Sequence, residues 1–371
     1  MDLGALRANI RRVSGGRPTL PMVKADAYGM GLAPVANALR RALPPHLLWA
    51  FGVAAVAEGE ALRACGWRGR IVVFAPTPPG EYERAAAADL SLALSEAEAV
   101  RRWAKAARRS GRRRAFHTEI DTGMGRAGFP CRAAARWGIE VERDAAEWLR
   151  WEGVFTHFYS ADEADSAPTE LQWQRFRSAL GQLPPGQTDI QRRVVHAANS
   201  AAALRFPPTA CDLVRPGIAL YGGAAGPDDH PHAVAALRAR VVLVREVPER
   251  TTVGYGATYA ARRTERWATL AIGYGDGVPR ALGPGGGEVL LNGARAPIIG
   301  RISMDVTVVD VSSVPGVETG GVATLIGRDG DEEITVDEVA ARCGTISYEI
   351  LSGLGPRLPR IYRDARPDPA R

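Results

Sequence analysis

Lysine is scarce in this chain, although basic residues are not. Of 47 basic residues in 371, only two are lysines, Lys24 and Lys105, and the others are arginines. Wherever a generic positive charge serves, the chain uses arginine. A lysine that remains is a candidate for chemistry that arginine cannot perform, because only an amine readily loses its proton and forms an imine. Lys105 lies in a basic helical stretch and has no other distinguishing feature, so Lys24 is the candidate.

Cysteine and long apolar runs are also scarce. The four cysteines are scattered, with no CxxC pair and no metal-ligand spacing, so we expect reduced thiols and no metal site. The first segment has no apolar core of signal-peptide length, and no later run approaches the roughly 18 apolar residues of a membrane helix. We therefore expect a cytoplasmic protein without a membrane partner.

The net charge of +6 does not by itself indicate a nucleic-acid partner, because 41 acidic residues are interspersed with the basic ones. The densest basic stretch, residues 101–114 (RRWAKAARRSGRRR), spaces its charges like one face of a helix, and no nucleic-acid-binding motif accompanies it. We expect a solvated surface there and no nucleic-acid partner. His230 and His232 lack an apparent third ligand, so we expect them to be solvated rather than metal-bound.

The length predicts two domains, and the first 220 residues contain eight short apolar runs separated by Ala/Arg-rich segments of helical periodicity. The runs are residues 20–24, 49–53, 71–76, 90–94, 115–120, 153–158, 193–198 and 211–218. Apolar runs that alternate with helices are typical of buried parallel strands. Eight such units predict an α/β fold, a (β/α)8 TIM barrel of about 250 residues. A doubly wound sheet is the structural alternative.

The amino-acid composition changes at residues 222–233, where Gly, Pro, Asp and His indicate a linker. From about residue 235 the sequence is typical of strands and turns, and Asn292-Gly293 predicts the tight turn of a hairpin. We therefore expect the barrel, which binds the cofactor, over residues 1–230 and a mostly β C-terminal domain over residues 231–371.

Distinctive motifs follow several of the predicted barrel strands, at the end where barrels build their active sites. Lys24 and Tyr28 lie in PMVKADAYGMG, Arg126 follows the alternating glycines of DTGMGR, and His157 ends the sixth run. Each has a plain alternative when taken singly: a lysine at the barrel rim, a simple turn, or a histidine satisfied in the core. The scarcity of lysine favours an imine-forming role for Lys24.

The last two barrel loops hold the residues that indicate a phosphate site. Ser200 follows the seventh run, and Gly217 and Ile218 follow the eighth, which is where barrels commonly bind phosphate. Arg215 directly precedes them. A phosphate site, an imine-forming lysine and a buried arginine together suggest pyridoxal 5'-phosphate. In the second domain, Tyr255, Tyr274 and Tyr348 stand beside Gly or small residues, although most such tyrosines are ordinary strand residues.

Taken in order, these motifs resemble the alanine racemase family of fold-type III pyridoxal-phosphate enzymes, from about Leu3 to Tyr362. The motifs are VKADAYG, DTGMGR, HAANSAA, VRPGIALYG, GYGATY, SMD and TISYE. The resemblance implies that Lys24 carries the cofactor and that Tyr255 is the second acid/base, hydrogen-bonded to His157. It implies that Arg215 bonds the pyridine nitrogen. The implied phosphate ligands are Tyr28, Ser200, Gly217, Ile218 and Tyr348.

For the substrate, the resemblance implies that Arg126 contacts the cofactor's phenolic oxygen and the carboxylate of alanine, with the backbone of Met304 nearby. The family is a head-to-tail homodimer, in which Tyr255 serves the other subunit's Lys24. The implied activity is racemisation of L-alanine and D-alanine, which supplies D-alanine for peptidoglycan.

Three positions depart from the family pattern. Glu119 stands where the family usually has a carbamylated lysine, and we expect its carboxylate to hold Arg126 instead. Met30 replaces the histidine usual in AYGHG. The family's first strand is nearly absent before Leu3, which leaves open how the edge of the β domain is packed.

Alternatives remain within and outside this chemistry. A racemase of other amino acids, such as serine or a broad set, requires only a roomier pocket. A fold-type III decarboxylase shares the barrel and the lysine but lacks the arginine of VRPGIALYG. A non-catalytic pyridoxal-phosphate-binding protein is a single barrel, so the second domain argues against it.

Overall fold

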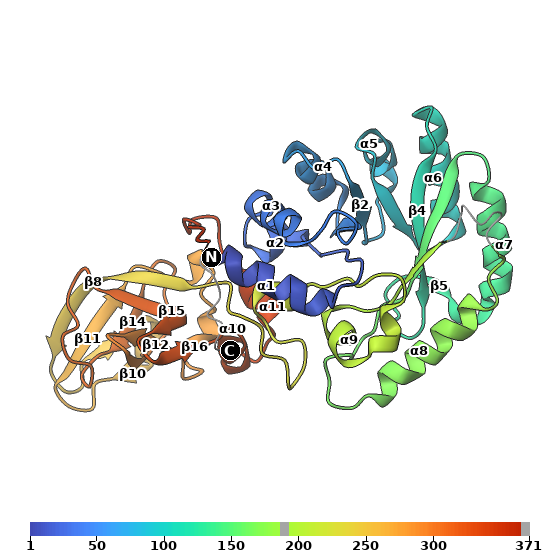
Figure 1. The fold of residues 1–371 in the computed structure, drawn as a ribbon. Coiled ribbons are helices and arrows are strands. Elements are labelled where there is room, and N and C mark those ends of the chain that lie inside the picture. Colours follow the sequence, from blue (N-terminus) through green and yellow to red (C-terminus); the bar gives the residue numbers. More distant parts are fainter. Residues whose placement is uncertain (186–192, 365–371) are drawn as a thin grey trace.

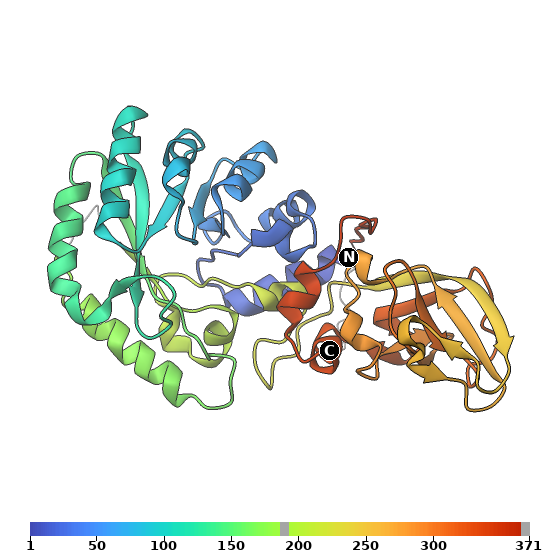
Figure 2. The same ribbon diagram turned by 180° about the vertical axis from the view of Figure 1, so that it is seen from behind.

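The computed structural model describes residues 1–185 and 193–364. A curved barrel of parallel strands and outer helices lies beside an elongated β domain, and the N-terminus lies near their junction (Figures 1 and 2). The predicted fold class, a TIM barrel followed by a mostly β domain, is confirmed.

The barrel strands are hydrogen-bonded in parallel in the order β1-β2-β3-β4-β6-β7. They are β1 (Ala50–Val53), β2 (Arg70–Val73), β3 (Ser91–Leu94), β4 (Arg114–Asp121), β6 (Leu149–Phe155) and β7 (Val194–His196), and the short β5 (Phe129–Pro130) pairs with β4. Because helices cover the outer face and side chains fill the inner one, β1 and β3 are buried along their whole length.

Two irregular segments close the barrel. Thr19 bridges to both Leu48 and Val214, and the Leu20 amide donates to the carbonyl of Val214 at 2.8 Å. The first and eighth predicted runs therefore complete the eight-stranded ring, although their pairing is shorter than the sequence predicted. Lys24 does not end the first strand, because the bridged part stops at Met22.

Outer helices pack their apolar faces on this sheet. They are α1 (Leu3–Ser14), α3 (Leu32–Ala42), α4 (Val56–Ala64), α5 (Tyr82–Ala87), α6 (Ala97–Arg109), α7 (Ala134–Ala145), α8 (Ala167–Leu180) and α9 (Ser200–Arg205). The short segment α2 (Lys24–Tyr28) is instead a turn with left-handed backbone. Short 3₁₀ turns are η1 (Pro79–Glu81), η2 (Cys131–Ala133), η4 (Pro207–Ala210), η5 (Ile218–Tyr221), η6 (Tyr255–Ala257), η7 (Tyr274–Asp276) and η8 (Arg280–Leu282).

The basic stretch at residues 101–114 is only partly helical. Helix α6 buries Val100 and Trp103 and exposes its arginines, as the periodicity predicted, but it ends at Arg109. Gly111 has φ +68°, a conformation that favours glycine, and the chain turns there. Arg114 then opens β4 with only 4% of its surface exposed. The expectation of one solvated helical face is therefore wrong for the last part of the stretch.

The second domain is built on an antiparallel sheet in the order β13-β12-β15-β8-β11-β14. Its strands are β8 (Leu237–Val247), β9 (Thr252–Val253), β10 (Tyr259–Ala260), β11 (Glu265–Leu270), β12 (Glu288–Leu291), β13 (Ala294–Pro297), β14 (Thr307–Asp310), β15 (Val322–Asp329) and β16 (Glu332–Ile334). The predicted hairpin is confirmed, since Leu291 pairs with Ala294 around Asn292 and Gly293, at φ +50° and +77°.

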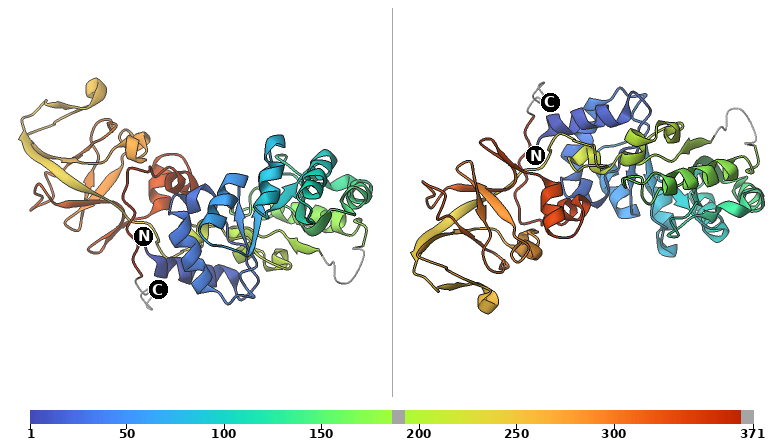
Figure 3. Two further views of the ribbon diagram at one scale, coloured as in Figure 1. Left: turned by 90° about the horizontal axis from the view of Figure 1, so that it is seen from above. Right: turned by 90° about the horizontal axis from the view of Figure 1, so that it is seen from below.

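Two helices that the sequence analysis did not predict, α10 (Val336–Arg342) and α11 (Ser347–Ser352), join the β domain to the barrel. Helix α11 packs against α2, and the views from above and below place these C-terminal helices beside the N-terminal part of the barrel (Figure 3). Consequently Tyr348 lies in a helix rather than in a strand. Among the helices within the described ranges, none has the length and apolarity needed to span a membrane.

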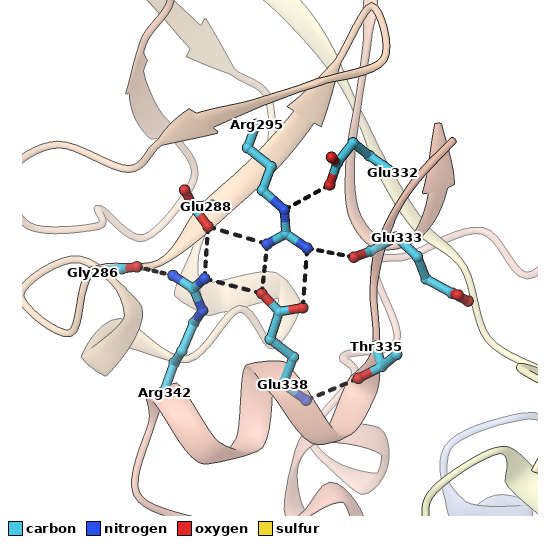
Figure 4. A network of polar contacts seen from close by, with 8 residues as sticks. All are labelled: Gly286, Glu288, Arg295, Glu332, Glu333, Thr335, Glu338 and Arg342. Carbon is cyan, nitrogen blue, oxygen red and sulfur yellow. Dashed lines mark hydrogen bonds and ion pairs between the residues drawn. The ribbon is translucent and has the colours of Figure 1, made fainter. Parts of the chain in front are cut away.

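An arginine-centred network fastens the β12–β13 hairpin to β16 and α10 (Figure 4). The Arg295 guanidinium donates to Glu332 at 2.8 Å, to Glu288 at 3.1 Å and to Glu338 at 2.7 Å. Arg342 donates to the same Glu288 and Glu338, at 2.6 and 3.0 Å. Because several elements share two guanidinium groups, the network stabilises the domain more than isolated surface ion pairs do.

We expect Arg295→Met to lower the free energy of unfolding by about 1–3 kcal/mol, because three carboxylates lose their common partner. The fall in Tm measured by calorimetry checks it. Arg328→Met is the matched control, since Arg328 makes a single 2.7 Å ion pair with Glu333 in the same domain. Equal losses of Tm in the two variants would contradict a cooperative network.

Candidate active site

Lys24 opens a turn of left-handed backbone. Residues 25–28 all have φ between +51° and +56°, although none of them is glycine. Each such residue costs about 1–2 kcal/mol. Glu58 holds the turn by accepting the amides of Ala25 and Ala54 at 2.6 and 2.7 Å, and Asp26 accepts the amide of Leu32 at 2.7 Å. A strained backbone that side chains fix in this way is typical of a functional site.

The Lys24 amine lies among cations. Burial lowers its pKa, the nearby Arg126 guanidinium lowers it further, and Glu58 partly opposes both. An amine with a lowered pKa is more often deprotonated, so it is a better nucleophile and base at neutral pH. Lys105, by contrast, is exposed on α6, as expected.

Hydroxyl and amide groups form a small cradle beside Lys24. The Gly217 amide donates to Ser200 Oγ at 2.8 Å, and Ile218 begins η5 directly after it. A Cβ atom at Gly217 would lie 2.4 Å from the Tyr28 hydroxyl, so only glycine fits there. Tyr348 of α11 reaches the same place, with its ring 6.0 Å from that of Tyr28. The five predicted phosphate-site residues therefore lie together.

The two tyrosines of the cradle are hydrogen-bond donors. Burial raises the pKa of Tyr28, and burial together with Asp162 and Asp337 raises the pKa of Tyr348. Both hydroxyls therefore keep their protons at neutral pH. The ring of Tyr28 is also stacked on Tyr221 at 4.5 Å, which fixes its direction. Neutral donors and backbone amides are suited to a phosphate group.

Arg215 is the most constrained cation of the barrel interior, with 4% of its surface exposed. Its Nη2 donates to the carbonyls of Thr156 and Ala197 at 2.9 and 3.1 Å and lies 3.5 Å from His157 Nδ1. Burial lowers the pKa of Arg215 to about 10, while Glu119 opposes the shift, so the guanidinium stays charged at neutral pH. A permanent cation is thus held at the centre of the barrel.

A buried chain of polar side chains, which we call the histidine relay, continues from Arg215 through the barrel. Arg215 Nη1 lies 2.9 Å from His196 Nδ1, and His196 Nε2 lies 2.9 Å from His117 Nδ1. His117 Nε2 lies 3.5 Å from Glu152. Both histidines fall inside runs that the sequence analysis predicted as strands, residues 115–120 and 193–198, but it gave them no role. Their inward positions on β4 and β7 are the signal that identifies them.

Glu119 and Arg126 lie on the opposite side of the same cluster. Glu119 is 4% exposed, and burial raises its pKa, although the positive charges of Arg126 and Arg215 act against the rise. Asp121 shapes the loop that carries Arg126 by accepting the amides of Gly123 and Gly125 at 2.9 and 3.1 Å. Arg126 itself is exposed to solvent in the single chain.

Tyr255 and Met304 are not at the barrel mouth of their own chain. They lie in the β domain, where 66% of Tyr255 and 52% of Met304 is exposed. Tyr274, in η7, is exposed as well. Strand β10, four residues beyond Tyr255, lies on the part of the β domain away from the barrel (Figure 1). The predicted site residues thus form two separate groups within one chain.

Comparisons with known proteins match one protein family along nearly the whole chain. Residues 1–225 match the family model described as alanine racemase, N-terminal domain, and residues 234–362 match the C-terminal domain model. An alanine racemase of Symbiobacterium thermophilum is 39% identical over 370 residues, covering 98% of this chain and 96% of the relative.

Solved structures give the same result. The chain is similar to the crystal structure of alanine racemase from a D-cycloserine-producing Streptomyces lavendulae, with a TM-score of 0.90, 34% identity and coverage of 98% and 96%. It is also similar to the alanine racemase of Bartonella henselae with covalently bound pyridoxal phosphate, with a TM-score of 0.87, 29% identity and coverage of 98% of both chains.

Burial and the positive charges of Arg215, Arg126 and Lys24 lower the pKa of His157 to about 3. Below about pH 6.5 the unfolded chain therefore binds a proton at this residue that the folded chain does not. We expect stability to fall as pH decreases from about 7.5 to about 5, and to fall less in His157→Gln. Urea unfolding midpoints of the cofactor-free protein at both pH values measure this, with exposed His46→Gln as control. An unchanged pH dependence in His157→Gln would overturn the assignment.

Proposed function

The chain belongs to the alanine racemase family, and from this premise we propose that it interconverts L-alanine and D-alanine with pyridoxal 5'-phosphate as cofactor. Membership makes it an enzyme, an amino-acid racemase. We propose that the product D-alanine serves peptidoglycan synthesis in the cytoplasm. We also propose that the barrel and β domains divide at residues 230/231.

The residues at the barrel mouth fit this cofactor. Tyr28, Ser200 and Tyr348 supply hydroxyls, and Gly217 and Ile218 supply backbone, around a space that a Cβ atom at Gly217 would enter. Lys24 supplies an amine of lowered pKa beside it. When bound, pyridoxal phosphate supplies an aldehyde carbon for the amine and an electron-withdrawing ring that acidifies the α-carbon of the amino acid.

We assign Arg215 to the pyridine nitrogen of the cofactor. A guanidinium that stays protonated keeps that nitrogen unprotonated, which makes the ring a weaker electron sink. With Arg215 there, the bound cofactor would draw less charge away from the substrate α-carbon, which would favour return of the proton to that carbon over transamination. An enzyme that needs a strong sink would place a carboxylate there instead.

Racemisation requires two acid/base groups, because the α-proton leaves one face of a planar carbon and returns to the other. We assign Lys24 Nζ to one face and Tyr255 Oη to the other. The phenol has a reference pKa near 10, so it needs a partner that holds and tunes it. We assign that part to His157, whose Nδ1 faces the Arg215 donor at 3.5 Å, so that Nε2 of the neutral ring is left free to donate a hydrogen bond to the phenol oxygen.

The exposure of Tyr255 is the observation that carries the two-base proposal. In one chain Tyr255 is 66% exposed in the β domain, while Lys24 stands at the barrel mouth. A single chain therefore holds both acid/base groups, but not at the same place: Lys24 stands at the barrel mouth, and Tyr255 is exposed on the β domain. We propose a head-to-tail homodimer in which the partner subunit's Tyr255 and Met304 complete the mouth, with Arg126 and the Met304 backbone binding the carboxylate of alanine.

We expect Tyr255→Phe to keep the yellow colour of the bound cofactor but to lose about 10²-fold or more of its racemase rate, because one face loses its acid/base group. Deuterium incorporation from D₂O, followed separately for L-alanine and D-alanine, measures each face. Lys24→Ala is the matched variant and should lose the colour as well. A Tyr255→Phe enzyme that racemises at near-normal rate would mean that another residue is the second base. Rates on alanine, serine and lysine test the alternative of a broader racemase.

We propose further that Glu119 positions Arg126 with a permanent negative charge. The carboxylate is buried next to both Arg126 and Arg215, which oppose the rise in its pKa and favour the ionised form. A carbamylated lysine at this place would depend on dissolved carbon dioxide, whereas a glutamate does not. The glutamate side chain is shorter, so it holds the arginine less closely.

We expect the racemase rate to be the same in buffer depleted of carbon dioxide and in buffer with added bicarbonate. Glu119→Gln should raise the KM for alanine more than it lowers kcat, because it loosens Arg126 without removing an acid/base group. Glu119→Lys is the informative counterpart, since only that variant should respond to bicarbonate. Activity of the natural enzyme that collapses without carbon dioxide and recovers with bicarbonate would overturn the role of Glu119.

A further inference from the structure

An arginine-rich cavity, which we call the basal cavity, lies at the end of the barrel opposite the candidate active site. It has a volume of about 470 Å³ and is lined where β2, β3, β4 and β6 begin. The active-site loops follow the other ends of the same strands. Six arginines and only two carboxylates line it, a formal excess of four positive charges. No part of the racemase chemistry uses these residues.

Several of the arginines are fixed in place as a floor. Arg63 donates to the carbonyl of Gly69 at 2.6 Å and to that of Asp89 at 2.8 Å. Arg70 lies over the ring of Trp49 at 4.9 Å and donates to Glu152 at 3.1 Å. A guanidinium whose stem and one edge are fixed keeps its other N–H groups oriented, so less entropy is lost when a ligand binds.

The rim of the cavity carries arginines with little or no protein partner. The Arg112 guanidinium makes no hydrogen bond or ion pair with any residue in ranges 1–185 and 193–364, and the Arg68 guanidinium donates there only to the Arg63 carbonyl, at 3.2 Å. Both side chains are exposed. The free guanidinium groups at the rim and the fixed ones below them therefore offer many N–H donors to the basal cavity.

Two buried polar atoms also have no partner in the described part of the chain, one on Ser91 in the cavity lining and one on Arg114, between the lining residues Arg113 and Ala115. Ser91 lines the cavity with 5% of its surface exposed, and its Oγ makes no hydrogen bond. Arg114, 4% exposed, uses Nη1 for Asp89 at 2.6 Å, but its Nε is unpaired. Buried polar atoms are rarely left unsatisfied, so these two indicate a missing ligand or solvent.

The excess positive charge also disfavours the empty cavity. Burial lowers the pKa of Arg63; Asp89 opposes the shift, and the charge of Arg68 adds to it. Burial likewise lowers the pKa of Arg114, with Asp89 opposing the shift and Arg112 adding to it. The guanidinium groups therefore repel one another, and an anion of two or more charges would remove that repulsion.

We propose that the basal cavity is a binding site for a small molecule bearing phosphate groups. The planar guanidinium fork matches phosphate oxygens in pairs, and the volume is within the range of small-ligand sites. Arg112 and Arg113, which the sequence analysis assigned to a solvated helical face, supply part of the site.

The test is calorimetric titration of the holoenzyme with inorganic pyrophosphate, with the cofactor keeping the other phosphate cradle filled. We expect saturable binding that weakens about tenfold or more in Arg68→Ala/Arg112→Ala, and that also weakens when about 0.3 M NaCl screens the charges. Arg41→Ala/Arg108→Ala is the matched control, because both residues are exposed at helix C-terminal turns outside the cavity. This control should bind like the natural enzyme.

The double variant Arg68→Lys/Arg112→Lys separates the contribution of the guanidinium geometry from that of the positive charge. It keeps both positive charges but removes the planar forks, so we expect weaker binding than in the natural enzyme and tighter binding than in the alanine variant. Absence of saturable binding would overturn the proposal. Binding that is unchanged in the alanine variant, or lost equally in the control, would overturn it too.

Discussion

A buried guanidinium is the constraint around which the barrel interior is organised. A charge that is 4% exposed is stable only when its N–H groups are matched, and Arg215 meets this with two carbonyls and two histidines. Burial first, and then the positive charge of Arg215, lower the pKa of His157 and His196, so both stay neutral at neutral pH. The protonation states of these two histidines therefore follow from their burial beside one cation.

The lysine turn and the β domain depend on each other through the cradle. Residues 25–28 would not adopt a left-handed turn on their own, since each prefers negative φ. Tyr28 in that turn is held by Tyr221 on one side and by Tyr348 of α11 on the other. The β domain thus contributes to its own barrel through α11, while its tyrosine-bearing face at Tyr255 and Tyr274 is left exposed.

The barrel was predictable because parallel strands buried on both faces give continuous apolar runs, and the hairpin because Asn292-Gly293 suits its turn. The left-handed turn at residues 25–28 could not be predicted, since Ala25, Asp26 and Ala27 carry no preference for positive φ. The histidine relay could not be predicted either, because in the sequence His117 and His196 look like ordinary core histidines, and only their contacts in the folded chain distinguish them. The grouping of Lys24 with the phosphate cradle followed from motif order at strand ends, whereas the exposure of Tyr255 required the structure.

Glu152 relates the two ends of the barrel. One of its oxygens accepts Arg70 and Arg150 of the basal cavity, at 3.1 and 2.7 Å, and the other faces His117 of the relay. Burial alone would raise the pKa of Glu152, but His117, Arg150 and Arg70 lower it to about 2, so the group is a fixed anion. The relay therefore ends in a negative charge at the basal cavity and in a positive charge at the active site.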